Sequence, residues 1–527
     1  MTHLDEVQPA SPNVLFIITD QQRADHVGFA GNDTVRTPHL DSIAARGTVF
    51  DNAWVANPVC MPNRSSIMTG RMPSVHGVIF NDRSLEWGAN THVRQFRQAG
   101  YRTALIGKSH LQHGMSRTAA VESDLGPAVF NPHPRGWNTL EDAERYLDYA
   151  PEFPDSFYGF EHVELAIDHG SRISGHHMRW ALDKGADIEE LVVPMNDQCP
   201  GDRRHRDWWQ IFRPRYDADL HSSRFVAERT AAFIEDASRG AQPWLAWASF
   251  PDPHHPLCPP GEWFDRHRPA EVELPRTVDD PLDGAPEHIR RFANMHPSRQ
   301  RMWVEPCGVA GDHGLARAAI AATYGMVELI DDCVGQIVDT VDRAGVADNT
   351  IIVFTSDHGD MMGDHGLLLK GCMHYRGTLQ VPMVIAEPGQ IPIRTAALAS
   401  SIDLGPTLLD MANLEPYEGL QGISLMSQLE DPTASIRDYV LIEDDIPNAA
   451  RSWGDMPNRT RTLIAADLKY TRHSTGEEQL YNLARDPDEL VRLSTGHSAQ
   501  RAEMVELLAD ALIAADDNAR GAPVSSE

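Results

Sequence analysis

The segment YGMVELIDDCVGQIVDTVDRAGVADNTIIVFTSDHGD, residues 324–360, joins an amphipathic helix pattern to a buried strand pattern. Its apolar residues recur at helical spacing: Tyr324, Val327, Ile330, Val334, Ile337, Val338 and Val341. Gly345 ends this pattern, and a mainly apolar run over residues 350–356 then leads into Asp357. Such a run is typical of a parallel strand covered on both faces, so the segment predicts a helix followed by a central strand.

Other segments repeat this arrangement along the chain. NVLFIITDQQ (13–22) is a strand pattern that ends in Asp20, and HVRQFRQAGYRTALIGKSH (92–110) is a helix, a stop at Gly100 and a strand. PWLAWASFPDPHHP (243–256) is a strand that runs into a proline-rich loop. Alternating helices and strands predict a doubly wound, mostly parallel α/β sheet, in which ligands bind at the carboxyl ends of the strands.

The pattern changes near residue 430. RDYVLIED (437–444), RTLIAADLKYTRH (461–473) and EQLYNL (478–483) are typical of antiparallel strands, and QRAEMVELLADALIAA (500–515) of a final helix. We therefore expect a catalytic α/β domain over residues 1–430 and a smaller C-terminal α+β domain over 431–527. Within the first, residues 113–222 are rich in Pro, His and aromatic residues, and we expect an irregular excursion that covers the substrate site.

Composition limits the partners and the compartment. The 527 residues carry a formal net charge of −30, which argues against nucleic acid or an anionic membrane as partner. The first residues lack the pattern of a signal peptide, and no apolar run is long enough to span a membrane. Six scattered cysteines suggest no disulfide framework, so we expect a cytoplasmic protein.

Two polar pairs follow predicted strands, Asp20-Gln21 and Asp357-His358. Carboxylate and amide oxygens suit a hard divalent cation, and an imidazole extends the choice toward Mn²⁺. Each aspartate could instead cap the helix that follows its strand. Two such pairs on what should be neighbouring strands favour the metal.

A second group is cationic. Clustered cations at strand ends are what a tetrahedral oxyanion requires in an acidic protein, although each residue alone could be a solvated surface group. The members are Arg64, Lys108, His110, His254 and Lys370.

Cys60 lies in NPVCMPNRSSIMTGRMPSVHGV, residues 57–78, between two prolines. A zinc site is excluded because no further Cys or His pair stands at ligand spacing. A small buried hydrophobe and a thiolate whose pKa is lowered by Arg64 and a helix start both remain open. A thiolate beside a hard, carboxylate-bound cation is a poor match in softness.

The segment Cys60-Met61-Pro62-Asn63-Arg64 resembles the C-x-P-x-R signature of the sulfatases, a family of the alkaline-phosphatase superfamily. The following SSIMTGR resembles the family's auxiliary element, and the likeness continues through GYRTALIGKSH, SFPDPHHP, TSDHGDMMGDHGLLLKG and LYNLARDPDE. It extends over nearly the whole chain, and TDQQRAD and TSDHGD point to the bacterial arylsulfatase and phosphonate monoester hydrolase branch. Asn63 departs from the pattern, in which Ser or Ala is usual, so conversion of Cys60 could be incomplete.

The resemblance implies a modified nucleophile. A separate formylglycine-generating enzyme would oxidise Cys60 to formylglycine, whose hydrate attacks the ester and gives a covalent sulfated intermediate. The implied metal ligands, with Ca²⁺ first and Mn²⁺ as the alternative, are Asp20, Gln21, Asp357, His358 and residue 60. Arg64, Lys108 and Lys370 would hold the oxyanion. His254 would help to protonate the leaving oxygen, His110 would help to expel sulfate, and Asn81 would bind substrate.

The implied activity is hydrolysis of sulfate monoesters, with small aryl sulfates favoured, in a homo-oligomer of two or four chains. Lys108 and His110 in GKSH support sulfate, because the sulfatases keep a Lys and a His there. The alternative is a phosphonate monoester or phosphodiester hydrolase with promiscuous sulfatase activity. A third hypothesis, from another class, is an inactive binding protein in which Cys60 stays unmodified.

Overall fold

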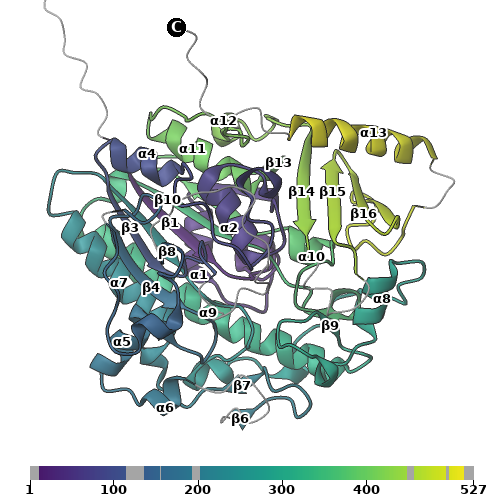
Figure 1. Ribbon diagram of the computed structural model, residues 1–527, viewed down its shortest axis with the longest axis horizontal. Coiled ribbons are helices and arrows are strands. Elements are labelled where there is room, and N and C mark those ends of the chain that lie inside the picture. The colour runs from purple at the N-terminus through teal and green to yellow at the C-terminus, as the bar shows by residue number, and fades with distance from the viewer. Residues whose placement is uncertain are drawn as a thin grey trace, which may run out of the picture.

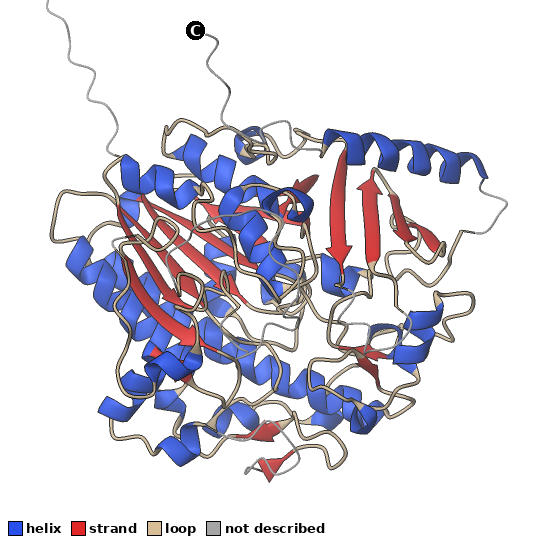
Figure 2. Cartoon of the chain, in the orientation of Figure 1, coloured by secondary structure: helices blue, strands red, loops and turns tan. Residues whose placement is uncertain are grey.

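Two sheets lie beside each other in the protein, each covered by helices (Figure 1; Figure 2). The computed structural model describes residues 11–113, 136–154, 156–192, 202–447, 456–493 and 498–515. The larger sheet fills the left half of Figure 1, and the smaller sheet stands at the upper right beneath the final helix.

The larger sheet has nine strands and is mostly parallel. In spatial order the strands are β13 (Ile393–Ser400), β2 (Thr48–Trp54), β12 (Met383–Ala386), β10 (Thr350–Ser356), β1 (Asn13–Thr19), β8 (Trp244–Ser249), β3 (Arg102–Gly107), β4 (His162–Ile167) and β5 (Ser174–Gly175). Only β12 and β5 run against their neighbours. The predicted doubly wound α/β class is therefore confirmed.

Both faces of this sheet are buried because helices pack on each side. Alternate residues of β1 belong to different apolar clusters, Phe16 and Ile18 to one and Leu15 and Ile17 to the other. The helices on the Phe16 side are α2 (Cys60–Thr69), α4 (His92–Gln98) and α11 (Leu404–Met411). Those on the Leu15 side are α1 (Pro38–Ala44), α7 (Ser222–Ala237) and α9 (His313–Arg343). Helix α9 begins well before the predicted start at Tyr324.

The smaller sheet is antiparallel, as predicted. Its four strands are β14 (Tyr439–Asp445), β15 (Arg459–Ala465), β16 (Leu468–His473) and β17 (Glu478–Asn482). Helix α13 (Ser498–Ala514) covers it through Met504, Leu508 and Ala511. The domain boundary placed at residue 430 stays a prediction.

Residues 113–222 are more regular than the sequence suggests. They contribute the last two strands of the large sheet, β4 and its edge strand β5, together with α5 (His176–Asp183), α6 (Ile188–Leu191), β6 (Asp202–Arg203) and β7 (Phe212–Arg213). The sequence does not predict β4, because HVELAI mixes polar and apolar residues, is only half-buried over its first three positions and lacks the continuous apolar run of the central strands. Parts of this segment, residues 114–135, 155 and 193–201, lie outside the described residues.

Short elements complete the fold. They are α3 (Pro73–His76), α8 (Glu287–Ala293), β9 (Cys307–Gly308), β11 (Leu367–Leu368), α10 (Arg376–Leu379) and α12 (Met426–Glu430). Across the described ranges, none of the helices combines the length and the hydropathy that crossing a membrane requires. Five cysteines fall in these ranges and none of them forms a disulfide there, whereas Cys199 lies outside them.

Candidate active site

Two neighbouring strands end in the acidic residues predicted to bind metal. β1 and β10 pair in parallel up to Thr19 and Ser356, so Asp20 and Asp357 leave the sheet side by side. Both carboxylates are fully buried. The backbone N–H of Gln21 donates to Asp357 Oδ1 at 3.0 Å, and Gln21 adopts a left-handed φ of 65°, which turns the chain sharply after the strand.

His358 completes a donor set that fits a divalent ion. Its Nε2 lies 3.7 Å from Asp20 Oδ1 and 3.6 Å from Asp357 Oδ1. Its Nδ1 lies 2.9 Å from the carbonyl oxygen of Gly359, so Nδ1 carries the proton and the Nε2 lone pair faces the carboxylates. Donor atoms of Asp20, Cys60, Asp357 and His358 all lie within 4.8 Å of one another. Two carboxylates and one imidazole suit a hard or borderline cation.

Gln21 lies beside this group with its amide held by other side chains. Its Nε2 contacts Asp360 Oδ2 and lies 3.0 Å from His255 Nδ1. These contacts orient Oε1 toward Lys370 Nζ, at 2.7 Å. Metal ligation by Gln21 stays a prediction.

Cys60 is the first residue of helix α2 and faces the same centre. Its Sγ lies 3.1 Å from His358 Nε2, 3.2 Å from Lys370 Nζ and 3.6 Å from Asp20 Oδ1. Burial and Asp20 favour the neutral thiol, but Lys108 and Lys370 outweigh them, so the pKa of Cys60 is lowered. The side chain is 1% exposed.

The predicted cations surround the two carboxylates. Arg64 Nε donates to Asp357 Oδ2 at 2.7 Å, and its Nη2 lies 3.3 Å from Asp20 Oδ2. The ammonium of Lys108 contacts Asp20 Oδ2 directly. Burial alone would raise the pKa of Asp20, but Lys108, Lys370 and Arg64 hold it well below its usual range. Arg64 thus neutralises the predicted metal ligands, and binding of a substrate oxyanion by Arg64 stays a prediction.

Three histidines form a stack over Lys108. The ring of His254 lies 3.7 Å from that of His169 and 4.0 Å from that of His255, with interplanar angles of 18° and 22°. The half-buried Trp303 lies beside the stack, with its ring 5.2 Å from that of His255 and 6.2 Å from those of His169 and His254. His254 therefore lies within the site, and its contact with substrate stays a prediction.

The remaining predicted residues are adjacent to this centre. The His110 ring lies 6.3 Å from that of His169, and burial together with Lys108 holds the pKa of His110 well below its usual range. Asn81 Oδ1 accepts the backbone N–H of Met61 at 3.0 Å and so contacts the first turn of α2. The structure brings all the predicted residues to one end of the sheet, while their catalytic roles stay predictions.

Sequence reasoning missed three buried residues of the site: His169, His255 and Asp360. His255 is adjacent to the predicted His254, and Asp360 is the last residue of the segment 324–360. Their closeness in sequence to predicted site residues was a signal that could have identified both. His169 follows strand β4 as Lys108 follows β3. The rule that located the other strand-end residues would have found His169 once β4 was recognised.

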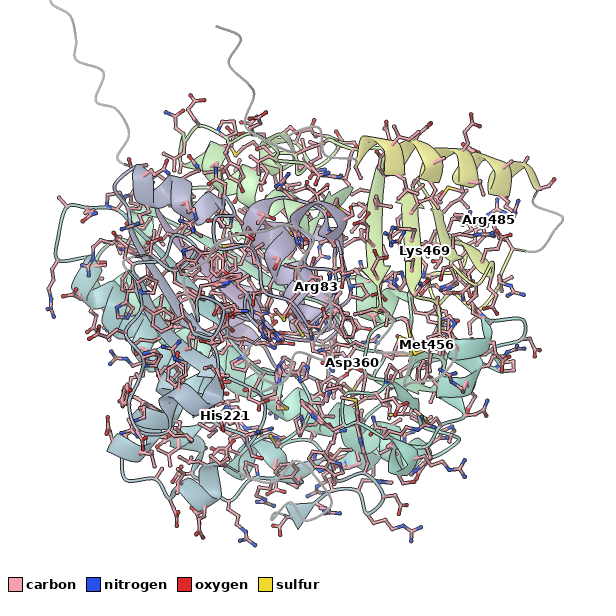
Figure 3. The ribbon with its side chains drawn as sticks, in the orientation of Figure 1. Arg83, His221, Asp360, Met456, Lys469 and Arg485 are labelled. Atoms are coloured by element: carbon pink, nitrogen blue, oxygen red, sulfur yellow. The ribbon has the colours of Figure 1, made fainter. Side chains whose placement is uncertain are left out.

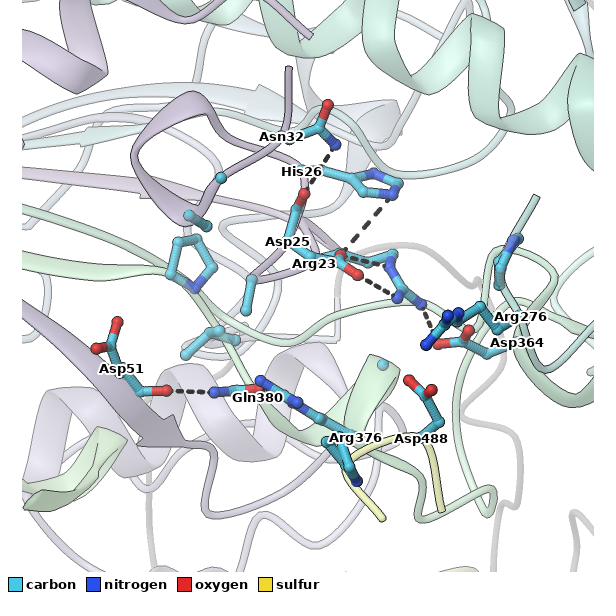
Figure 4. A pocket seen from close by; sticks show the side chains of 18 of the residues that line it. Arg23, Asp25, His26, Asn32, Asp51, Arg276, Asp364, Arg376, Gln380 and Asp488 are labelled. Carbon is cyan, nitrogen blue, oxygen red and sulfur yellow. Dashed lines mark hydrogen bonds and ion pairs between the residues drawn. The ribbon is translucent and has the colours of Figure 1, made fainter. Parts of the chain in front are cut away.

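A separate charged cavity of about 670 Å³ adjoins the segments that follow β1 and β10 (Figure 4). Arg23, His26, Arg276 and Arg376 line it, and Arg23 pairs with Asp25 and Asp364 in its wall. Arg23 also donates to the backbone oxygen of Asp360 at 2.9 Å. Asp360, near the middle of Figure 3, contacts Gln21, so this cavity and the Cys60 centre share one wall.

The mostly parallel sheet, with buried acidic residues at its strand ends and helix α2 beginning at Cys60 beside them, is consistent with a hydrolase of the alkaline-phosphatase superfamily. The family model described as Sulfatase matches residues 12–414, and the model described as N-sulphoglucosamine sulphohydrolase, C-terminal, matches residues 363–517. The protein therefore belongs to the sulfatase family, as the signature at Cys60 predicted.

Relatives of full length share this assignment. An arylsulfatase of Clostridium perfringens is 29% identical over 513 residues, covering 95% of this chain and 94% of the relative. A choline-sulfatase of Rhizobium meliloti is 26% identical, covering 92% and 82%. The solved structure of a phosphonate monoester hydrolase of Agrobacterium radiobacter matches with a TM-score of 0.76 at 24% identity and covers 96% of each chain, which supports the fold.

Proposed function

We propose that the protein hydrolyses sulfate monoesters, with aryl sulfates as the favoured class, through residue 60 in its formylglycine form. One observation carries the proposal: Cys60 Sγ lies between a carboxylate-imidazole group that fits a cation and the ammonium of Lys370. Cys60 Sγ thus lies close both to the position expected for the cation and to the Lys370 ammonium, which can hold a tetrahedral anion. The arylsulfatase of Clostridium perfringens supports the aryl preference through its sequence similarity.

The donor set would be Asp20, Asp357 and His358, with Gln21 and residue 60 beside it. A divalent ion bound there, Ca²⁺ or Mn²⁺, supplies positive charge that makes a nearby hydroxyl more acidic and neutralises the ester oxygens. In its formylglycine form, residue 60 would supply two hydroxyls, one to attack the ester and one whose proton would be lost as sulfate leaves.

The other side chains bind the anion and move protons. Lys108 and Lys370 bind the sulfuryl oxygens as charge develops on the leaving group. His254 donates a proton to the leaving oxygen, and His110, buried and neutral, takes the proton of the second hydroxyl. Asn81, whose Oδ1 accepts the backbone N–H of Met61, binds substrate beside the first turn of α2.

The burial of Cys60 supports modification before folding. At 1% exposure, its thiol is out of reach of another enzyme in the folded protein, so the formylglycine-generating enzyme would act on the unfolded segment. A cytoplasmic location and assembly into dimers or tetramers stay predictions, which cell fractionation and sedimentation velocity test.

The alternative is a phosphonate monoester or phosphodiester hydrolase with sulfatase side activity. The cations beside Cys60 suit any tetrahedral anion, and a relative in Trinickia caryophylli, 26% identical over 519 residues, is described as a multifunctional alkaline phosphatase superfamily protein. Lys108 and His110 favour sulfate.

The test compares an aryl sulfate with an aryl phosphonate monoester that has the same leaving group. The protein is co-produced with a formylglycine-generating enzyme, and mass spectrometry of the residue 60 peptide measures conversion. We expect higher kcat/KM for the sulfate, and no turnover for Cys60→Ala. A higher kcat/KM for the phosphonate would establish the alternative, and full activity with an unmodified thiol would exclude the formylglycine mechanism.

A further inference from the structure

His169 holds the ammonium of Lys108. Its Nε2 lies 2.5 Å from Lys108 Nζ and 3.9 Å from Asp20 Oδ2. An ammonium group only donates hydrogen bonds, so this nitrogen is the acceptor and the ring proton sits on Nδ1. Nδ1 faces Asp168 Oδ1 at 3.4 Å. The side chain of His169 is 3% exposed, so these contacts are shielded from water.

The backbone before His169 is specially shaped to place it. Asp168 has a φ of 72°, in the left-handed region that few residues other than glycine adopt. Its carboxylate also accepts the backbone N–H of His169 at 2.9 Å. Strand β4 therefore ends in a fixed turn that directs the imidazole toward Lys108.

Asp20, His169 and His254 together have the composition of a metal site. One donor atom from each lies within 4.8 Å of the others, and all three side chains are buried. Asp20 also belongs to the group formed with Cys60, Asp357 and His358, so it lies between the two. The ammonium of Lys108 contacts Asp20 and His169, two of the three members, and His254 stacks on His169.

We propose that Asp20, His169 and His254 form a second cation site, that the ammonium of Lys108 fills it, and that His169 is a positioning residue for that ammonium. With Lys108 removed, the trio takes a divalent ion of the Zn²⁺ class, because two imidazoles and one carboxylate suit a borderline cation. Asp20 and His169 use two of the three ammonium donors, and the third stays for a sulfuryl oxygen. This last role rests on the proposed function, whereas the cation site does not.

The first experiment counts metal. Wild type, Lys108→Ala and Lys108→Ser are dialysed against ZnCl₂ and then against buffer, and metal per chain is measured by mass spectrometry. We expect one more equivalent in at least one Lys108 variant than in wild type. The matched control is Lys370→Ala, which removes the other ammonium near Cys60 but none that contacts His169, and it keeps the wild-type count. Adding His169→Phe to the Lys108 variant removes the extra equivalent.

Two results of this count overturn the cation site. One is an unchanged metal content in both folded Lys108 variants. The other is an extra equivalent that persists after His169→Phe, because the ion would then bind elsewhere. Neither depends on a substrate, so the count decides even if wild type turns over no sulfate ester.

The second experiment separates hydrogen bonding from ring packing. His169→Gln keeps an acceptor for Lys108, whereas His169→Phe keeps a ring against His254 and removes the acceptor. We expect His169→Phe to lower kcat for an aryl sulfate by about 10- to 100-fold with a smaller change in KM, as loss of a supporting contact does, and His169→Gln to retain most of it. The reverse order of the two variants overturns the positioning role.

Discussion

At the scale of single residues, Asn63, which departs from the family signature, uses both ends of its side-chain amide in buried hydrogen bonds. Its Oδ1 accepts the backbone N–H of Ala56 at 3.0 Å and the hydroxyl of Ser401 at 2.7 Å, and its Nδ2 donates to the backbone oxygen of Asp357. Asn63 is fully buried, so water cannot replace these partners. It therefore ties helix α2 to the end of β10, which carries the predicted metal ligands.

Replacement of Asn63 by alanine should destabilise the protein. Asn63→Ala leaves buried partners unsatisfied, and we expect a loss of about 1–3 kcal/mol in the free energy of unfolding, measured by urea denaturation. Ser65→Ala is the matched control on the same helix, because the buried Ser65 hydroxyl has no hydrogen-bond partner among the described residues. Equal stability of the two variants would show that the Asn63 contacts contribute little.

The sequence predicts the polar residues at the strand ends one by one. It does not predict the side chains that contact them. Asp20, Asp357 and Lys108 each follow a run of apolar residues that marks a buried strand, so sequence alone placed them at one edge of the sheet. His169 escaped because the strand before it mixes polar and apolar residues and is only half-buried over its first three positions. The pairing of Arg64 with both carboxylates escaped as well, since it depends on how α2 packs against the strand ends.

At the scale of elements, the small sheet braces the loops of the active site. Glu443 of β14 pairs through its backbone N–H with the Ala56 oxygen at 2.9 Å, just before Cys60. Lys469 of β16, labelled in Figure 3, contacts both Glu489 Oε1 and the backbone oxygen of His374. His374 belongs to the loop that follows Lys370. The second sheet therefore supports both segments that flank the Cys60 centre.

The buried pair of Lys469 and Glu489 should be costly to break. Lys469→Ala leaves the Glu489 carboxylate uncompensated in the interior, and we expect unfolding to become easier by about 3–5 kcal/mol. The control is Lys184→Ala, which breaks the exposed pair with Glu228 at 2.6 Å and should cost at most about 1 kcal/mol. Urea denaturation measures both, and losses of similar size would argue against the buried pair as a brace.

Two strand ends share the predicted ion, so metal and stability should be coupled. An ion that binds only the folded protein stabilises it by about 2.7 kcal/mol at a hundredfold excess over Kd. We expect a chelator to lower the melting temperature of wild type and Ca²⁺ or Mn²⁺ to restore it. Asp357→Ala should melt at one temperature under all these conditions, and a metal response in that variant would contradict the ligand assignment.

At the scale of the whole molecule, the net negative charge opposes the approach of the anionic substrate that we propose. The chain carries −30 overall, yet Arg64, Lys108 and Lys370 gather around two buried carboxylates. Long-range attraction cannot recruit an anionic ester, so binding depends on short contacts within the site. Composition predicted the global charge and the fold class followed from periodicity, but the placement of the small sheet beside the site required three-dimensional packing.

Acid should destabilise the whole fold through its buried neutral histidines. Burial lowers the pKa of His177 to about 3, and its Nε2 lies 2.8 Å from the backbone oxygen of Leu220. The unfolded chain has the ordinary pKa of about 6.5, so it binds the proton first and the folded state loses stability as pH falls from 6.5 toward 3. His177 thus contributes a slope of about 1.4 kcal/mol per pH unit in this window.

His177→Gln keeps a donor for the Leu220 oxygen and cannot be protonated, so it isolates this effect. We expect the free energy of unfolding of the variant to fall less steeply than that of wild type between pH 6.5 and 4.5, by about 1.4 kcal/mol per unit. His313→Gln, at a side chain 46% exposed, is the control for the loss of a histidine at the surface. Urea denaturation at several pH values gives the three slopes. Identical slopes for His177→Gln and wild type would mean that His177 accepts a proton without unfolding, which requires water to reach the interface of α5 and α7.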